Sequence, residues 1–481
     1  MKYESVIGLE VHAELSTATK IYCSCKNEFG LDVNTACCPV CTGMPGTLPV
    51  LNKKVVDYAI KAGLALNCKI THRGKQDRKN YFYPDLPKAY QISQFDLPLC
   101  TDGYLDIDVN GEKKRIGITR IHIEEDAGKL VHSDTDNVSY ADYNRCGVPL
   151  IEIVSEPDMR TPEEARAYME TLKSVLQYIE VSDCKMEQGS LRCDINVSIR
   201  PEGQEEFGTR TEMKNVSTFS GGQRAIEYEI ARQIEIVENG GVITQQTRRW
   251  DDLMGKNFPL RSKEEAHDYR YFPEPDLMPI VVDDDWIESI RKELPELPDV
   301  KRKKYIENYK IPSDDADILI SDKKAAKFFE SCVDCGINPK TAANWILGDI
   351  TRRIKDEGIE FDNLRFNAKA LKELTDMVDN KILSVTAAKK VLANMFECDK
   401  SPKQITDELG LAQVSDESAI KELVDSVIAQ NPQSLEDYKN GKTRALGFLV
   451  GMAMKQSKGK GNPQIINKLL TERLEEYKAN N

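Results

Sequence analysis

Leu191-Arg-Cys-Asp-Ile-Asn-Val-Ser-Ile-Arg200 alternates apolar and polar side chains from its first residue to its last. Successive side chains of a β-strand point to opposite faces, so this period of two predicts a strand with one apolar and one polar face. Such a strand belongs to a sheet that packs one face on a hydrophobic core. The polar face of this strand carries Arg192, Asp194 and Asn196.

A second strand is predicted from Arg115 to Glu124. Isoleucines mark its apolar face, but their phase slips between Ile118 and Ile121, which indicates a β-bulge. After the slip, one face carries Arg120, His122 and Glu124.

A helix is predicted between these two strands. Thr161 suits the N-cap, Pro162 suits the first turn, and Glu164 is placed to complete a capping box. Apolar residues then recur at helical spacing, namely Ala165, Tyr168, Met169, Leu172, Val175, Leu176 and Ile179.

The domain organisation changes at Glu293-Leu-Pro-Glu-Leu-Pro298, because two prolines so close together break regular structure. Beyond this linker the pattern is almost entirely helical, with helix starts predicted at Asn338-Pro339 and Ser401-Pro402. We therefore predict three domains: a mixed α/β catalytic domain at 1–298, a helical domain at 299–400 and a small helical tail domain at 401–481.

The 481-residue chain carries a net charge of −13, so most of its surface should repel nucleic acid. One segment, 438–471, contains basic residues and no acidic residue. Such a segment favours a contact with nucleic acid or phosphate, although charge alone is equally compatible with a solvated helix face. Its basic residues are Lys439, Lys442, Arg444, Lys455, Lys458, Lys460 and Lys468.

Two cysteine pairs, Cys23-Ser-Cys25 and Cys38-Pro-Val-Cys41, have the spacing of a four-thiolate zinc site. The chain has 13 cysteines, an odd number, and no apolar run of signal-peptide or membrane-span length. We therefore expect a cytoplasmic protein without disulfides and without membrane contact. The other cysteines are interpreted as small packing residues.

Carboxylates and one imidazole recur on the predicted strands, and this donor set suits magnesium next to a phosphate substrate. Cations that could hold phosphate oxygens accompany them, as phosphoryl transfer requires. Surface ion pairs could produce the same pattern. The polar set is Glu10, His12, Glu124, Glu125, Asp126, Glu152, Asp194, Asn196 and Glu212, and the cations are Lys79, Arg192, Arg210, Lys214 and Arg270.

Other catalytic motifs are missing from the sequence. Gly441-Lys-Thr443 lacks the first glycine of a P-loop, since Glu436 occupies that position. There is no GxGxxG, no amidase signature and no glutaminase His/Cys pair, so any ammonia used must come from another protein.

Long stretches of the chain resemble the B subunit of the tRNA-dependent aspartate/glutamate amidotransferase. One of them is Ile7-Gly-Leu-Glu-Val-His-Ala-Glu-Leu15, and the tail segment Gly441-Lys-Thr-Arg-Ala-Leu-Gly-Phe-Leu-Val-Gly451 resembles the tRNA-contacting end of that family. The similarity covers essentially the whole chain. The remaining stretches are Asp77–Gln94, His122–Lys129, Pro149–Asp158, Gly189–Ser198 and Asp268–Asp276.

The resemblance implies an α+β fold in which an antiparallel-sheet cradle carries the active site and two helical domains follow. It implies a carbon–nitrogen ligase that uses glutamine as amido donor, within a heterotrimer with an amidase A subunit and a small C subunit. ATP and magnesium would phosphorylate the side-chain carboxylate of Glu-tRNA(Gln) or Asp-tRNA(Asn). Ammonia from the amidase would then displace the phosphate.

Matching the motifs assigns roles to residues of this chain. Glu10, His12, Glu124 or Glu125, and Glu152 are predicted magnesium ligands, and Glu212 is a further candidate. Lys79, Arg192 and Lys214 are predicted to hold phosphate oxygens together with Arg270, and Asp194 and Asn196 to orient the aminoacyl end or the metal. Cys23, Cys25, Cys38 and Cys41 are predicted to bind a structural zinc ion, and Lys442, Arg444, Lys455, Lys458 and Lys460 to contact tRNA.

Two other functions are compatible with parts of the sequence. The first is a tRNA-binding or zinc-binding adaptor without chemistry of its own, which would not need the carboxylate set. The second is a stand-alone ligase or kinase acting on a small acid, and the basic tail argues against it.

Overall fold

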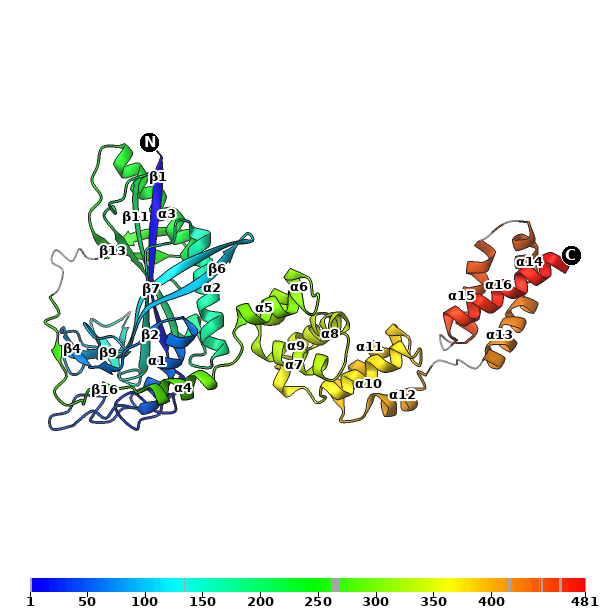
Figure 1. Cartoon of the computed structure of the whole chain (residues 1–481), viewed down its shortest axis with the longest axis horizontal. Helices are drawn as coiled ribbons and strands as arrows, with labels where there is room; N and C mark the ends of the chain where they lie inside the picture. Colours follow the sequence, from blue (N-terminus) through cyan, green and yellow to red (C-terminus); the bar gives the residue numbers. More distant parts are fainter. Residues whose placement is uncertain are drawn as a thin grey trace. The chain divides into compact units, whose positions relative to one another are not determined.

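A computed structural model describes residues 2–133, 135–260, 268–412, 417–440, 442, 444–457 and 461–480. The chain divides into two compact units, Met1–Pro298 and Asp299–Asn481 (Figure 1). The first unit combines a large sheet with helices, and the second is helical, so the predicted α+β fold class is confirmed. The further division at residue 400 stays a prediction.

The described part of the first unit contains a sheet of nine strands. Neighbouring strands are antiparallel except for one parallel pair, Thr211–Lys214 with Gln246–Asp251. The predicted antiparallel sheet is therefore mixed at this one pair. The chain joins this pair through a helix, the crossover that parallel strands require. The order is β14 (Lys256–Pro259), β13 (Gln246–Asp251), β12 (Thr211–Lys214), β11 (Leu191–Pro201), β1 (Tyr3–Glu14), β10 (Pro149–Ser155), β7 (Glu112–Glu125), β6 (Cys100–Val109) and β2 (Lys69–Ile70).

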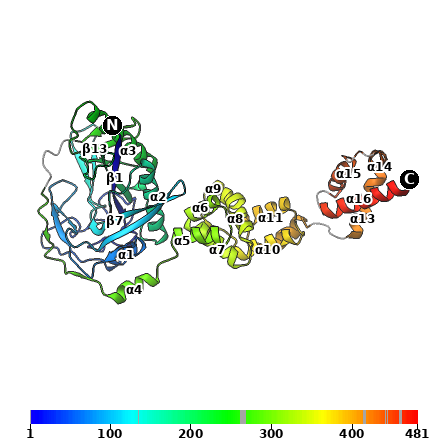
Figure 2. The ribbon, with the colours of Figure 1, turned by 45° about the horizontal axis from the view of Figure 1, so that its top comes forward.

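Helices cover the apolar face of this sheet (Figures 1 and 2). The odd-numbered side chains of β11, from Leu191 to Ile199, are buried against them, as the alternation predicts. The same face of β1 contributes Ile7, Leu9 and Val11 to the shared core. The covering helices are α1 (Lys53–Ala65), α2 (Pro162–Tyr178) and α3 (Phe219–Glu238).

The predicted β-bulge in β7 is confirmed. Val154 of β10 lies opposite Arg120, whereas Ser155 lies opposite Ile118, so Thr119 is the extra residue. The bulge places the side chains after residue 119 in a new phase.

The predicted start of α2 is confirmed, but its capping box is not. The Thr161 hydroxyl accepts a hydrogen bond from Glu164 N at 3.2 Å. The Glu164 carboxylate accepts from Arg160 N instead of Thr161 N, at 2.6 Å, and pairs with Lys114 Nζ of β7 at 2.7 Å. The ion pair with Lys114 of β7 explains why the Glu164 carboxylate does not accept the hydrogen bond from Thr161 N that a capping box requires.

Short strands form three smaller sheets outside the large sheet in the described part of the first unit. β5 lies next to the end of β7, and the chain that follows residue 267 returns to pair with β4. These strands are β3 (Arg73–Gly74), β4 (Asp77–Asn80), β5 (Tyr90–Ser93), β8 (Lys129–His132), β9 (Ser139–Asp142), β15 (Phe272–Pro273) and β16 (Ile280–Val281), and the 3₁₀ turn Met186–Gln188 and α4 (Asp284–Lys292) complete the unit.

Every regular element described beyond Asp299 is helical. Asn338 caps α8 and Ser401 forms a capping box with Gln404 at α12, so both predicted helix starts are confirmed. None of the described helices has the length and apolarity needed to span a membrane. The helices are α5 (Pro298–Glu307), α6 (Ser313–Ser321), α7 (Lys323–Asp334), α8 (Pro339–Trp345), a π turn (Ile346–Ile350), α9 (Thr351–Glu357), a 3₁₀ turn (Phe361–Asn363), α10 (Ala368–Asp379), α11 (Val385–Glu397), α12 (Pro402–Leu409), α13 (Glu417–Gln430), α14 (Pro432–Lys439), α15 (Arg444–Gln456) and α16 (Pro463–Asn480).

Candidate active site

The register of the four central strands aligns acidic and basic side chains on the polar face of the sheet. His12 of β1 lies opposite Glu152 of β10 on one side and Arg192 of β11 on the other. Glu152 in turn lies opposite His122 of β7. Residues directly opposite on neighbouring strands have side chains in contact range, so the sheet itself forms this row.

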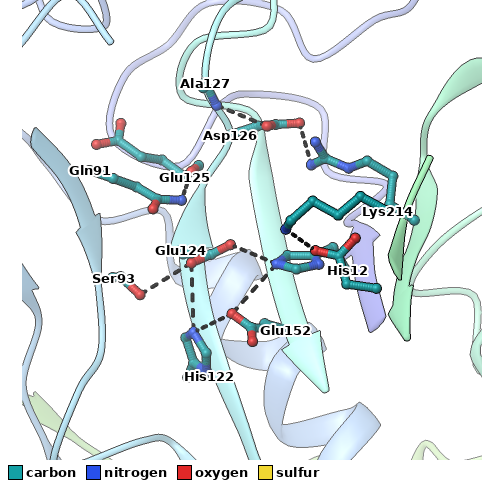
Figure 3. A network of polar contacts seen from close by, with 12 residues as sticks. His12, Gln91, Ser93, His122, Glu124, Glu125, Asp126, Ala127, Glu152 and Lys214 are labelled. Atoms are coloured by element: carbon teal, nitrogen blue, oxygen red, sulfur yellow. Dashed lines mark hydrogen bonds and ion pairs between the residues drawn. The ribbon is translucent and has the colours of Figure 1, made fainter. Parts of the chain in front are cut away.

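His12, Glu124 and Glu152 form a cluster that could hold a metal ion (Figure 3). His12 Nε2 lies 3.5 Å from Glu124 Oε1 and 3.5 Å from Glu152 Oε2, and one ligand atom from each residue falls within 4.8 Å of the others. Burial lowers the pKa of His12, but the hydrogen bond to Glu152 and the charge of Glu124 outweigh it and raise that pKa. Two carboxylates and one imidazole nitrogen are donors that fit a divalent cation.

His122 contacts this cluster, and the sequence analysis assigned it no role. Its Nε2 lies 3.1 Å from Glu152 Oε2 and 3.6 Å from Glu124 Oε2, so the two carboxylates lie between two imidazoles (Figure 3). Burial lowers the pKa of His122, but the charges of Glu152 and Glu124 raise it to about 9. The shared face of His122 and Glu124 was the sequence signal that could have identified it.

A cavity of about 550 Å³ opens beside the cluster. Its lining combines the acids and imidazole of the sheet with cations from three elements, and its remaining wall includes Tyr81, Leu150, Met186 and Val216. The predicted site residues that line it are His12, Lys79, Glu124, Arg192, Asp194 and Lys214.

The cations of the cavity are held by specific partners. The Arg192 guanidinium donates to Asp126 Oδ2 at 2.7 Å, and Lys214 Nζ donates to Asp194 Oδ2 at 2.5 Å. Lys79 Nζ lies 4.9 Å from the centre of the Tyr269 ring. These contacts fix the cationic groups before any ligand enters.

Arg145 also lines the cavity and was not predicted from the sequence. Its guanidinium donates to the carbonyls of Ala127 and Gly128, at 2.9 and 2.8 Å, and lies 3.5 Å from Asp126. No local pattern marks it, because it lies in a loop outside the predicted strands.

The structure places four predicted ligand or phosphate residues outside both the cluster and the cavity lining. Glu10 is half-buried and accepts a hydrogen bond from Asn196 Nδ2 at 2.9 Å. Glu125 points away from the cluster (Figure 3), and its carboxylate pairs with Lys88 and accepts a hydrogen bond from Ile92 N. Glu212 accepts from Thr247 at 2.6 Å and pairs with Lys214, and Arg270 is exposed outside the cavity lining.

The predicted zinc ligands come together. One sulfur from each of the four cysteines lies within 4.8 Å of the other three. Cys38 N donates to Cys41 Sγ at 3.0 Å, as in a turn that directs two sulfurs inward. A hydrogen bond from Cys23 lowers the pKa of Cys41 to about 5. Four sulfurs at this spacing are a donor set that fits zinc.

Comparison with known proteins identifies the family. Residues 5–288 match the family model of the GatB/GatE catalytic domain, and residues 327–474 match that of the GatB domain. The chain belongs to this family. The predicted membership and the predicted enzyme class, part of an amidotransferase, are confirmed.

Relatives match over nearly their full length. The B subunit of the aspartyl/glutamyl-tRNA(Asn/Gln) amidotransferase of Caldicellulosiruptor bescii is 61% identical over 478 residues, which are 99% of this chain and 100% of the relative. The proteins of the same name from Thermoanaerobacter pseudethanolicus and Clostridium botulinum are 58% and 55% identical. These alignments cover 98% of this chain and 100% and 99% of the relatives.

The GatB-domain match contains the predicted tRNA contacts. Arg444 and Lys455 are exposed at the two ends of α15, and Lys442 is exposed and pairs with Asp437 at 2.9 Å. Lys458 and Lys460 lie outside the described residues.

Proposed function

We propose that this chain uses ATP to phosphorylate the side-chain carboxylate of Glu-tRNA(Gln) or Asp-tRNA(Asn), and then replaces the phosphate with ammonia. The products would be Gln-tRNA(Gln) and Asn-tRNA(Asn). The observation that carries the proposal is the cavity, because its lining includes His12 and Glu124 of the donor set for a divalent cation and also presents four cations. The names of the relatives support the same substrates.

The chemical problem is the poor reactivity of a free carboxylate. Its oxygen is a bad leaving group, so ammonia cannot displace it at neutral pH. Transfer of the γ-phosphoryl group to that oxygen creates an acyl phosphate, from which inorganic phosphate departs readily. The cavity must therefore accept a triphosphate and a carboxylate, and must stabilise the charge that develops between them.

Lys79, Arg192 and Lys214 would hold phosphate oxygens in this reaction. Arg192 and Lys214 keep their positions through Asp126 and Asp194, so these carboxylates orient the cations. Arg145 is a fourth cation in the same lining. Cations fixed in advance lower the barrier because little reorganisation accompanies the transfer.

His12, Glu124 and Glu152 would hold magnesium, and their donor set fits this ion. Bound magnesium would neutralise charge on the phosphate oxygens during transfer. His122 would keep both carboxylates oriented from the side opposite His12.

Partners would supply what this chain lacks. The sequence has no glutaminase signature, so ammonia would come from an amidase A subunit in a heterotrimer that also contains a small C subunit. The exposed residues Lys442, Arg444 and Lys455 would contact tRNA phosphates, together with Lys458 and Lys460, which lie outside the described residues. The zinc ion at the four cysteines would be structural.

The test is an amidation assay with the A and C partners, ATP, magnesium and Glu-tRNA(Gln), and either glutamine or ammonium chloride as nitrogen donor. We expect conversion of Glu to Gln on the tRNA. Glu152→Gln and His12→Ala should abolish it without loss of tRNA binding, whereas His132→Ala, a control on exposed strand β8, should leave it unchanged.

The assay also separates the alternatives. If neither nitrogen donor gives product with Glu-tRNA(Gln) or with Asp-tRNA(Asn), while tRNA binding is intact, the chain is an adaptor. Turnover of a free acid without tRNA would instead support a stand-alone ligase.

A further inference from the structure

Lys20 is a completely buried lysine beside the cysteine cluster. It exposes 0% of its surface. Its Nζ donates to Cys41 Sγ at 3.8 Å and to the carbonyl oxygen of Tyr143 at 3.5 Å. Among the residues that the structure describes, no carboxylate forms an ion pair with this ammonium group. A sulfur atom is therefore its only side-chain partner in that part of the chain.

This environment requires a negative charge near Lys20. A buried ammonium without a counter-charge is costly, and proteins pair such groups or leave them exposed. Four protonated thiols are neutral, and so are two disulfides. Four thiolates around a divalent ion, by contrast, carry a net charge of two negative units. The cluster carries its full charge of two negative units beside Lys20 only when it holds a metal.

Glu125 is the competing source of negative charge. Gly147 is next to both side chains, since a Cβ placed on it would lie 3.7 Å from Lys20 Cδ and 4.0 Å from Glu125 Oε2. The Glu125 carboxylate, however, already pairs with Lys88 and accepts from Ile92 N. Its charge is compensated by a cation of its own, which favours the cluster as the partner of Lys20.

We propose that Lys20 is the buried counter-charge of a metal–tetrathiolate cluster at Cys23, Cys25, Cys38 and Cys41. It is a positioning residue, because it acts on the metal site through Cys41. A hydrogen bond from an ammonium to a thiolate stabilises the charged form of the cluster, as outer-shell contacts do at other metal sites.

The second contact of Lys20 extends this arrangement toward the cavity. Tyr143, whose carbonyl accepts from Lys20, is two residues before Arg145. The cysteine loop holds the same segment, since Asn34 Oδ1 accepts from Tyr143 N at 2.7 Å and Asn144 Nδ2 donates to the Asp32 carbonyl at 2.7 Å. A loaded cluster therefore fixes the loop from which Arg145 enters the cavity.

The proposal is tested by combining metal removal with a neutral substitution at Lys20. The melting temperature of the full chain is measured for wild type and Lys20→Met, each loaded with zinc and each metal-free. We expect Lys20→Met to destabilise the loaded form more than the metal-free form. Equal destabilisation of both forms would mean that Lys20 contributes packing only, or compensates the charge of Glu125. Either result would overturn the proposal.

Zinc release gives a second readout that does not depend on the metal-free form being folded. Transfer of zinc from loaded protein to a colorimetric chelator should be faster in Lys20→Met, with an affinity about 10–100-fold weaker. Lys20→Gln keeps an N–H donor without the charge and should behave like Lys20→Met. If Lys20→Gln released zinc at the wild-type rate, the charge of Lys20 would be excluded as the cause of zinc retention, and the proposal would be overturned.

Lys114→Met is the matched control. Lys114 lies in the same unit and its Nζ pairs with Glu164 at 2.7 Å on α2. Its loss should lower stability equally in loaded and metal-free protein and should not change zinc release. A change in zinc release in this variant would show that any lysine substitution has the effect.

Discussion

The stability of the first unit should depend on pH through His122. Burial lowers the pKa of this histidine, but the charges of Glu152 and Glu124 raise it from 6.5 to about 9. A tenfold change in proton affinity is worth about 1.4 kcal/mol, so this rise stabilises the folded state by about 3 kcal/mol when His122 is protonated.

The sign follows from the two pKa values. Because the folded state binds the proton more tightly than the unfolded state, the contribution is complete below about pH 6.5 and is lost as the pH rises through about 9. The pKa of His12 is raised as well, so this histidine also makes the free energy of unfolding decrease as the pH rises. The effect of His122 is therefore the difference between wild type and His122→Gln, a variant that keeps an N–H donor but does not titrate.

The assay is urea unfolding without magnesium, at intervals from pH 6 to pH 10. Trp345 belongs to the second unit, so a Trp345→Phe background leaves Trp250 and Trp286 as reporters of the first. We expect the free energy of unfolding of wild type to exceed that of His122→Gln by about 3 kcal/mol at pH 6, and the difference to vanish near pH 10. A difference that is constant across this range would refute the assignment of the proton to His122.

Magnesium provides the link to the proposed metal site. Ion and protonated imidazoles compete for the same carboxylates, so added magnesium should stabilise the protein more at pH 9 than at pH 6. Stabilisation that is independent of pH would place the ion elsewhere.

Three further outcomes test separate parts of the structure. Leu172→Ala on α2 removes a side chain from the core and should cost about 2–5 kcal/mol in thermal unfolding, whereas Glu170→Ala on the exposed side of that helix should change stability by less than about 0.5 kcal/mol. Cys23→Ser should lower zinc content and melting temperature, and a variant normal in both would contradict a structural zinc site. A chain that ends near residue 400 should fold and bind ATP but lose tRNA affinity, and unchanged affinity would contradict the role of the tail.

Local pattern was sufficient for most of the fold. The alternation from Leu191 to Arg200, the slip after Ile118 and the caps at Asn338 and Ser401 each depend on neighbouring residues in the sequence. The parallel pairing of β12 and β13 was not predictable in this way, because it depends on where α3 returns the chain. The capping box failed for the same reason, since Lys114, which pairs with Glu164, is 50 residues away in the sequence.

The site was only partly predictable. Sequence reasoning left Glu124 and Glu125 as alternatives, and the structure places Glu124 in the cluster and Glu125 against Lys88. Successive residues of a strand always face opposite sides, but which side meets His12 depends on the pairing of β7 with β10 and of β10 with β1. His122 became a candidate only when that pairing placed it opposite Glu152.

By itself, the sequence determined the strand and helix types, the cysteine spacing and the residue classes available for phosphate and metal chemistry. These properties follow from local periodicity and from side-chain chemistry. The tertiary structure alone decided which carboxylates share one cluster, that Arg145 borders the cavity and that Lys20 has a sulfur atom as its side-chain partner. Strand register and loop packing bring together residues more than a hundred positions apart, and no local pattern contains that information.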